Sequence, residues 1–268
     1  MAVIDTEELT KFYGAERGIE SVTMSVEAGE VFAFLGPNGA GKTTTIRTLL
    51  DLLHPSRGRA RIFGLDSRRD SVAIRRRLGN LPGDFGYGKH SSGREALALL
   101  ARLRGVDDLG RAEQLAERFR ADLDRSLGKL SRGNRQKVGL ILAMFHSPEL
   151  LILDEPTSGL DPLMQEEFLA LVREERERGC AIFLSSHELD EVERVCDRVG
   201  IIRDGRLIAV ERIHDLLAKT QRRNLVEVEF AEPVELEDVR ALPGVVAAEF
   251  AHATLEEAFL AYYSEEEK

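Results

Sequence analysis

The segment Gly36-Pro-Asn-Gly-Ala-Gly-Lys-Thr43 constrains the fold more strongly than any other part of the chain. The apolar run Val31–Leu35 precedes it, and a helical pattern over residues 43–53 follows it. A short apolar run bounded by glycines is typical of a strand buried on both faces. In this order of strand, glycine-rich loop and helix, successive backbone N–H groups converge on phosphate oxygens at the positive end of the helix. A glycine-rich turn that binds nothing is the alternative, and the flanking elements disfavour it.

Polar and charged side chains are expected to complete a phosphate site. Two lie in this loop, and two follow a second apolar run. Lys42 is expected to reach the β- and γ-phosphates, and the Thr43 hydroxyl to ligate magnesium. The run 150–153 ends in Asp154 and Glu155, and carboxylates after a buried parallel strand lie where open α/β sheets bind ligands. We expect Asp154 to hold magnesium, directly or through water, and Glu155 to accept a proton from an attacking water. Two exposed acids at a strand end are the alternative.

Two further residues are candidates for the same region. His187 follows another buried run, 180–184, so we expect it at the same sheet edge, where an imidazole can contact a phosphate. Tyr13 follows the first predicted strand and is placed to stack on a base. A structural histidine and an aromatic residue that covers the core are the competing interpretations.

The periodicity of the whole chain predicts an α/β fold. Strands are expected at 3–12, 21–26, 31–35, 150–153 and 180–184, with helices at 43–53, 165–178 and 188–195. Buried strands that alternate with helices favour a mainly parallel sheet, and the alternating segment 21–26 favours an antiparallel one. A helical insertion occupies 83–148. After a hairpin turn at Asp204-Gly205, the extension 213–268 is predicted to hold a helix at 213–219, a strand at 224–230 and a helix at 255–263.

Composition excludes several classes of protein. The formal net charge of -10 disfavours nonspecific nucleic-acid binding. Cys180 and Cys196 have apolar neighbours and no CxxC spacing, which favours core packing in a reducing compartment. The longest apolar run, 138–145, is far shorter than the roughly 20 residues that span a bilayer. We therefore expect a cytosolic chain unless another chain brings it to a membrane. The arginines at 68–69 and 75–77 are expected on a solvated face.

The segment LSRGNRQ, 130–136, precedes the apolar run and contains no acidic residue, histidine or cysteine. Ser131 fits the N-cap of a helix. These residues alone leave open whether the segment only caps a helix or also holds a ligand.

The motifs together resemble the nucleotide-binding subunit of an ABC transporter. Their order is Tyr13, GPNGAGKTT, LSRGNRQ, LLILDEP, SGLD (158–161) and SSHEL (185–189), and the resemblance spans residues 3 to about 212. It is closest to bacterial antibiotic and drug exporters whose permease is a separate polypeptide. This resemblance implies a P-loop NTPase core at 1–82 and 149–212, with an antiparallel β subdomain. It also implies a helical subdomain at 83–148 and a small α+β extension at 213–268.

The resemblance also implies a mechanism in which two such subunits sandwich two ATP molecules head to tail. ATP and Mg²⁺ are the implied cofactors, Glu155 the general base, His187 the γ-phosphate sensor, and Thr43 and Asp154 the magnesium ligands. Ser131 and Gly133 are implied to contact the γ-phosphate in the partner's site, and Asp161 to connect the two sites. The cradle for ATP would comprise Gly36, Asn38, Gly39, Gly41, Lys42, Thr43 and Thr44.

The same resemblance implies the partners and the location. They are a homodimer formed through ATP and a separate transmembrane permease, with no nucleic acid and no direct membrane insertion. The chain would lie in the cytoplasm, at the inner face of the cell membrane. A soluble ABC-type ATPase that acts on nucleic acid or ribosomes is the alternative, and a non-catalytic nucleotide-binding regulator is a third reading.

The chain departs from the family pattern at three positions. Gly83 stands where many relatives have a glutamine that touches magnesium, so the contact is lost, or Asp84 or water replaces it, or the loop mainly conveys motion. In LSRGNRQ, Arg132 replaces a glycine of the common LSGGQ motif, and Asn134 replaces its glutamine.

Overall fold

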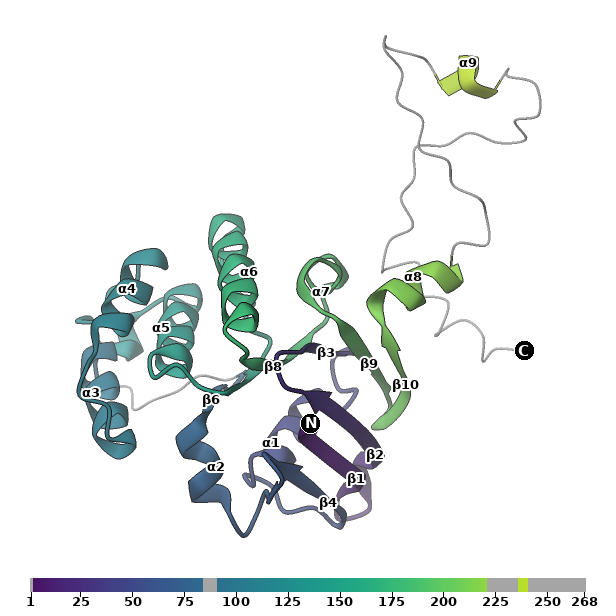
Figure 1. Cartoon of the computed structure of the whole chain (residues 1–268), viewed down its shortest axis with the longest axis horizontal. Helices are drawn as coiled ribbons and strands as arrows, with labels where there is room; N and C mark the ends of the chain where they lie inside the picture. Colours follow the sequence, from purple (N-terminus) through teal and green to yellow (C-terminus); the bar gives the residue numbers. More distant parts are fainter. Residues whose placement is uncertain (1, 84–90, 221–235, 241–268) are drawn as a thin grey trace. The chain divides into compact units, whose positions relative to one another are not determined.

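The structure is a computed structural model that describes residues 2–83, 91–220 and 236–240 (Figure 1). The chain divides into two units, Met1–Arg212 and Ile213–Lys268. In the second unit the described residues form helices α8 (Ile213–Thr220) and α9 (Leu236–Arg240). The helix predicted at 213–219 is therefore present. The strand predicted at 224–230 and the helix predicted at 255–263 lie outside the described residues.

A six-stranded sheet forms the centre of the first unit, in the order β10-β9-β3-β8-β7-β6. Five neighbouring strands, from β9 to β6, run parallel, and β10 pairs antiparallel with β9 through the predicted hairpin at Asp204-Gly205. The mainly parallel sheet is confirmed. The strand bounds are β3 (Val31–Leu35), β6 (Leu78–Leu81), β7 (Leu150–Asp154), β8 (Ala181–Ser186), β9 (Arg198–Arg203) and β10 (Arg206–Arg212).

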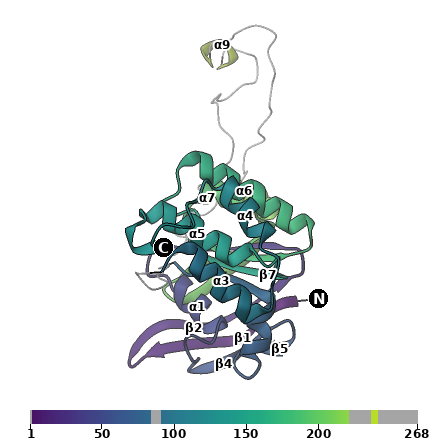
Figure 2. The same ribbon diagram turned by 90° about the vertical axis from the view of Figure 1, so that its left-hand side faces the viewer.

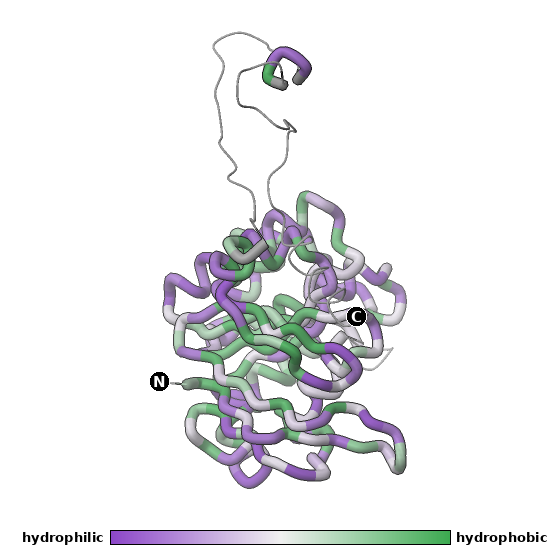
Figure 3. The backbone as a smooth tube through the Cα atoms, turned by 90° about the vertical axis from the view of Figure 1, so that its right-hand side faces the viewer, coloured by the Kyte–Doolittle hydropathy of each residue, from purple (hydrophilic) through white to green (hydrophobic). Residues whose placement is uncertain are grey.

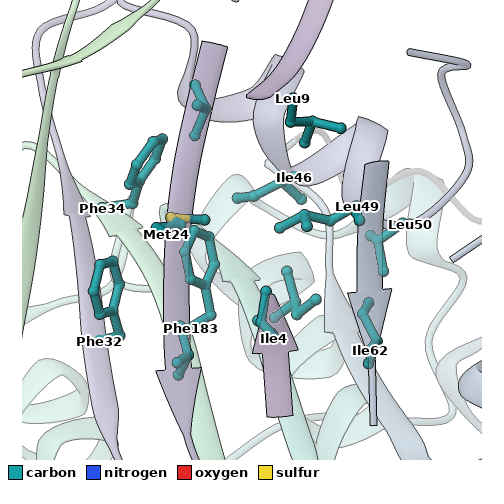
Figure 4. Close-up of a cluster of buried hydrophobic side chains, with 14 of the residues drawn as sticks. Ile4, Leu9, Met24, Phe32, Phe34, Ile46, Leu49, Leu50, Ile62 and Phe183 are labelled. Carbon is teal, nitrogen blue, oxygen red and sulfur yellow. The ribbon is translucent and has the colours of Figure 1, made fainter. Parts of the chain in front are cut away.

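A second, antiparallel sheet has the order β2-β1-β4-β5. Its strands are β1 (Ala2–Tyr13), β2 (Glu16–Glu27), β4 (Arg57–Ile62) and β5 (Leu65–Asp66). Helix α1 (Lys42–Leu49) contributes Ile46 and Leu49 to a hydrophobic core between the two sheets, where they meet Phe34 and Phe183 (Figure 4). Apolar stretches of the chain gather in the strands around this core, and hydrophilic stretches in the outer turns and helices (Figure 3).

Helices surround the six-stranded sheet. Helices α6 (Pro162–Glu177) and α7 (Leu189–Val195) lie on one side of it and α1 on the other (Figure 1). Helices α3 (Gly93–Arg104), α4 (Gly110–Arg118) and α5 (Arg132–Met144) lie side by side beyond β6 (Figure 2). A 3-10 turn at Leu127–Lys129 precedes α5, and α2 (Ser71–Arg77) leads into β6. Over residues 91–148 the regular secondary structure consists of helices joined by loops, together with an isolated bridge, Ser92 to Ser126.

The extent of one predicted helix differs from the structure. The helix predicted over 43–53 ends at Leu49, because Asp51 adopts a left-handed conformation and the amides of Leu52 and Leu53 return to the carbonyl of Arg47. The solvated face predicted for the arginines at 68–69 and 75–77 agrees with the structure: four of them are exposed, and Arg77 keeps 40% of its side chain exposed. Its guanidinium is paired with Glu149 and lies 3.9 Å from the centre of the Phe63 ring. Among the described helices, each is too short or too polar to cross a membrane.

Candidate functional site

The loop between β3 and α1 is shaped by glycine. Gly41, the N-cap of α1, has a φ of 109°. A Cβ atom on it would lie 2.8 Å from Ile19 Cγ2 and 2.9 Å from the carbonyl oxygen of Gly18, so a larger residue would push the loop off β2. No side chain caps α1, and its first turn contains no acidic residue. The N-terminal end of this helix therefore keeps its positive potential for an anion.

Lys42 lies inside the loop. Its side chain is 6% exposed, and Nζ donates to the carbonyl oxygens of Gly36, at 2.6 Å, and Pro37, at 3.3 Å. Nζ also lies 3.2 Å from Glu155 Oε1, an ion pair without hydrogen-bond geometry. The predicted phosphate-binding lysine and the predicted base are thus brought together.

Asp154 ends β7 with both carboxylate oxygens engaged. Oδ2 accepts a hydrogen bond from the Thr43 hydroxyl at 2.8 Å, and Oδ1 accepts one from the Ser185 hydroxyl at 2.5 Å. Asp154 and Ser185 face each other in the β7–β8 register, and both are buried. Ser185 was not predicted as a site residue. The signal that identifies it is the register of two adjacent parallel strands, which the motifs alone do not supply.

Glu155 follows Asp154 in a left-handed conformation with a φ of 51°, which is uncommon for a residue with a side chain. Its amide donates to the Ser185 carbonyl at 3.2 Å and to the Ser185 hydroxyl at 3.1 Å. Its Oε2 lies 2.6 Å from Nδ1 of His187, which follows β8 as predicted. Backbone strain of this kind costs about 1–3 kcal/mol and persists where the surroundings fix it. The carboxylate is therefore held between Lys42 and His187.

Tyr13 and the outer part of the loop lie at the surface. The Tyr13 hydroxyl is 3.4 Å from the Thr44 hydroxyl, and the residue is 46% exposed. Asn38 and Gly39 are also exposed. Tyr13 therefore lies beside the first turn of α1 with nearly half of its surface exposed.

The segment LSRGNRQ begins α5. Ser131 caps this helix by accepting a hydrogen bond from the Asn134 amide at 3.3 Å. Arg132 donates to the Ser158 hydroxyl at 2.6 Å, and the Gln136 amide group donates to the carbonyl oxygens of Glu155 and Pro156, each at 2.9 Å.

Two glycines and an aspartate lie around the loop that follows Glu155. A Cβ on Gly133 would lie 2.3 Å from the carbonyl oxygen of Gly159, so the helix start packs directly on this loop. Asp161 caps α6 by accepting from the Met164 amide at 3.0 Å, and its other oxygen is 3.8 Å from Lys137 Nζ. Within the chain, LSRGNRQ therefore contacts the loop after Glu155.

Gly83, where a glutamine was expected by resemblance, faces the Asp154 carboxylate. A Cβ atom built on Gly83 would lie 3.0 Å from Asp154 Oδ2. The glycine thus occupies a position from which a side chain would reach the same oxygen that accepts the Thr43 hydroxyl. Asp84, the possible substitute, lies outside the described residues.

The chain is similar to known proteins. Residues 19–158 match the family model described as ABC transporter. The bacitracin transport ATP-binding protein BcrA of Bacillus licheniformis is 39% identical over 83% of this chain and 74% of its own length. The daunorubicin/doxorubicin resistance ATP-binding protein DrrA of Streptomyces peucetius is 36% identical over 77% of this chain and 64% of its own length. A solved ATP-binding subunit of an ABC transporter superposes with a TM-score of 0.77 at 32% identity, over 83% of this chain and 95% of that one.

Proposed function

The chain belongs to the ABC transporter family, as an ATP-binding subunit, and from this membership we propose that it is the ATPase of an exporter with a separate permease. The observation that carries the proposal is the convergence of Lys42, Asp154, Glu155 and His187 at one edge of the sheet. ATP binding follows from the family, and the names of BcrA and DrrA support an exporter of a bacitracin-like or drug-like cargo.

The loop is proposed to cradle the phosphates of ATP through its backbone N–H groups and the start of α1. Its members would be Gly36, Asn38, Gly39, Gly41, Lys42, Thr43 and Thr44. Lys42 would exchange its present contacts, two carbonyl oxygens and Glu155, for phosphate oxygens of opposite charge. Tyr13 would stack on the base.

The donor pair Thr43 and Asp154 fits magnesium. Mg²⁺ prefers oxygen ligands and in nucleotide sites takes one or two protein groups, with phosphate and water completing the shell. The Thr43 hydroxyl and Asp154 Oδ2, 2.8 Å apart, are such oxygens. When bound, the ion would neutralise charge on the β- and γ-phosphates. Ser185 would hold the carboxylate from its other side.

Glu155 is proposed to take the proton of the attacking water, and His187 to sense the γ-phosphate. The two groups already touch, at 2.6 Å, so the imidazole can orient the carboxylate and respond to charge on the phosphate. The strained backbone of Glu155 supports this role, since strain concentrates where a side chain must be aimed.

The capping segment is proposed to act on the nucleotide of a second subunit. Ser131 and Gly133 lie at the exposed start of α5, whose first turn contains no acidic residue. In a head-to-tail homodimer, the hydroxyl and the N–H groups there would bind the partner's γ-phosphate. Arg132 contacts Ser158 in the loop after Glu155, Asp161 follows that loop as the cap of α6, and we propose that Asp161 links the two sites.

We place the chain in the cytoplasm, at the inner face of the cell membrane, bound to its permease without inserting into the bilayer or binding nucleic acid. The loop at Gly83 is proposed to couple to the permease and to add little to magnesium binding. Asp84→Ala should then leave the magnesium dependence of turnover unchanged, and a severe magnesium defect would contradict this.

Turnover by a matched pair of variants tests the hydrolytic role. Glu155→Gln keeps the size of the side chain but cannot accept the proton, so kcat should fall about a hundredfold or more while ATP still binds. Glu166→Gln removes an exposed carboxylate of α6, which pairs with Arg194 of α7 outside the site, and should match the wild type. Wild-type turnover by Glu155→Gln would contradict the proposed base. Recovery of a polytopic permease with the tagged chain from host membranes separates the exporter from a soluble ABC-type ATPase.

A further inference from the structure

A partly buried hydrogen bond joins the loop after Glu155 to the helix after His187. The Thr157 hydroxyl donates to Glu191 Oε2 at 2.8 Å. Thr157 follows Glu155 by two positions and is buried, and Glu191 follows His187 by four positions, in α7. The Thr157–Glu191 contact is therefore a second bridge between the two strand ends that are already joined by Glu155 and His187.

The carboxyl group of Glu191 is costly where it lies. In the part of the chain that the structure describes, its Oε1 is buried and has no hydrogen-bond partner. A buried carboxyl oxygen without a partner destabilises a fold, even in a partly buried residue, and an apolar side chain of similar size would avoid that cost. Stability alone therefore does not account for a glutamate at this position. We attribute it instead to the contact with Thr157.

The group that it holds is a short turn that fixes the orientation of Glu155. The amide of Ser158 donates to the Glu155 carbonyl at 3.2 Å, and the amide of Leu160 donates to the Thr157 carbonyl at 2.9 Å. Gln136 binds the Glu155 carbonyl from the other side. A shift of Thr157 would therefore rotate the left-handed peptide from which the Glu155 carboxylate extends.

We propose that Glu191 is a positioning residue for ATP hydrolysis: through Thr157 it fixes the turn that aims Glu155 toward the attacking water and His187. The proposal rests on the hydrolytic function proposed above, and on Glu155 as its base. It predicts an effect on the chemical step, kcat, rather than on the binding of ATP, because neither Thr157 nor Glu191 lies in the loop that cradles phosphate.

The charge of Glu191 is sensitive to its surroundings. Burial is the main cause that raises the pKa of Glu191 to about 7, and the nearby Glu188 and Glu155 also raise this pKa. The Thr157 hydrogen bond and His187 act in the opposite direction and lower it. Arg194, one turn along α7, is paired with Glu166, and the buried Cys196 thiol keeps a raised pKa. As pH rises through neutrality Glu191 becomes charged, and a carboxylate accepts the Thr157 hydrogen bond more strongly than a carboxylic acid does. The hold on Glu155 should therefore tighten as pH rises.

The experiment measures kcat and KM for ATP across the neutral pH range in the full-length chain. Glu191→Leu and Thr157→Val should each lower kcat about tenfold with KM for ATP within about twofold of wild type, and the double variant should lose no more than either one. Glu191→Gln still accepts the Thr157 hydrogen bond but does not titrate, so it should lack the inflection near pH 7 that we expect for the wild type. Asp190→Asn removes an exposed charge from the same helix turn and should keep the wild-type profile.

Wild-type kcat in both Glu191→Leu and Thr157→Val, or losses that add in the double variant, would overturn the positioning role. Identical pH profiles for wild type and Glu191→Gln would overturn the proton linkage. Because Gln matches Glu in size, its profile stays informative if the Leu variant does not fold. A wild-type protein without turnover would instead overturn the hydrolytic function itself.

Discussion

At the scale of single residues, the orientation of Asp154 depends on Ser185. The Ser185 hydroxyl is the partner of Asp154 Oδ1 and also receives the Glu155 amide, so one side chain holds both acidic residues. Ser185→Ala would leave a buried carboxylate oxygen without its donor, which costs about 1–3 kcal/mol. We expect this variant to need a several-fold higher magnesium concentration for half-maximal ATPase activity, with ATP binding nearly unchanged.

The neighbouring serine is the control for that variant. Ser186 bonds only to the backbone of Glu188 among the described contacts, so Ser186→Ala should keep the wild-type magnesium dependence. If the two alanine variants require the same magnesium concentration, Ser185 does not position Asp154 as the proposed magnesium ligand. Titration of steady-state turnover with magnesium, at saturating ATP, gives the comparison directly.

At the scale of elements, charge pairs join α4 to α6. Arg111 pairs with Glu175, which is 1% exposed, and also donates to the Met144 carbonyl at 3.0 Å. Arg118 pairs with Glu167 and Glu174 nearer the surface. Removing one partner of a buried pair leaves an uncompensated charge, whereas exposed pairs contribute little. Arg111→Met should therefore lower the free energy of unfolding by about 3 kcal/mol.

Arg118→Met is the matched variant for this comparison, with an expected loss of about 1 kcal/mol or less. Urea unfolding of the two proteins under the same conditions measures the difference. Equal losses would show that the depth of Glu175 does not decide the energy of the contact, and that Arg178, 3.1 Å from the same carboxylate, suffices to neutralise it.

The junction between α5 and β6 should make the fold sensitive to acid. Burial, with Arg104 as a second cause, lowers the pKa of His146 from 6.5 to about 4, and its Nε2 lies 3.2 Å from the Leu78 carbonyl oxygen. Between these values the unfolded chain binds a proton more readily than the folded one, so stability falls as pH falls. The loss should reach roughly 3 kcal/mol by pH 4. The difference between the urea midpoints at neutral and acid pH should be smaller in His146→Gln than in the wild type. In His214→Gln, which changes an exposed residue, this difference should equal that of the wild type.

The elements that sequence predicts well are those with a local signature. The apolar runs of β3, β7 and β8 and the glycine loop before α1 each carry their own pattern, so their type and order are as expected. Strand β4 was not predicted: it is short, contains no apolar run, and buries only Ala60 and Ile62. The contact of Ser185 with Asp154 and that of Thr157 with Glu191 arise only when strands and helices pack. Periodicity and motifs carry no information about that register.

At the scale of the whole molecule, the proposed second subunit accounts for the exposed start of α5. Within one chain this segment contacts the loop after Glu155, through Arg132 and Gln136. In a head-to-tail dimer the same helix start would meet the partner's nucleotide. A change at one γ-phosphate would then pass through α5 to the base that serves the other ATP, and closure and hydrolysis would be mechanically linked.

Three substitutions at Ser131 separate a helix cap from a phosphate contact. Ser131→Arg fills the space of the γ-phosphate and should abolish ATP-driven dimerisation while ATP binding to the monomer stays near normal. Ser131→Asp is the sharper variant, because aspartate caps a helix as well as serine does but repels an anion. Ser131→Thr keeps both the cap and the hydroxyl.

Light scattering with ATP, in a Glu155→Gln background that slows hydrolysis, measures the dimer. We expect dimers with Ser131 or Thr at this position, and monomers with Asp or Arg, although the Asp variant should unfold at the same urea concentration as wild type. The helix and the dimer then respond to different properties of one side chain. A Ser131→Asp protein that dimerises normally would show that the hydroxyl serves α5 alone, as it visibly does through the Asn134 amide.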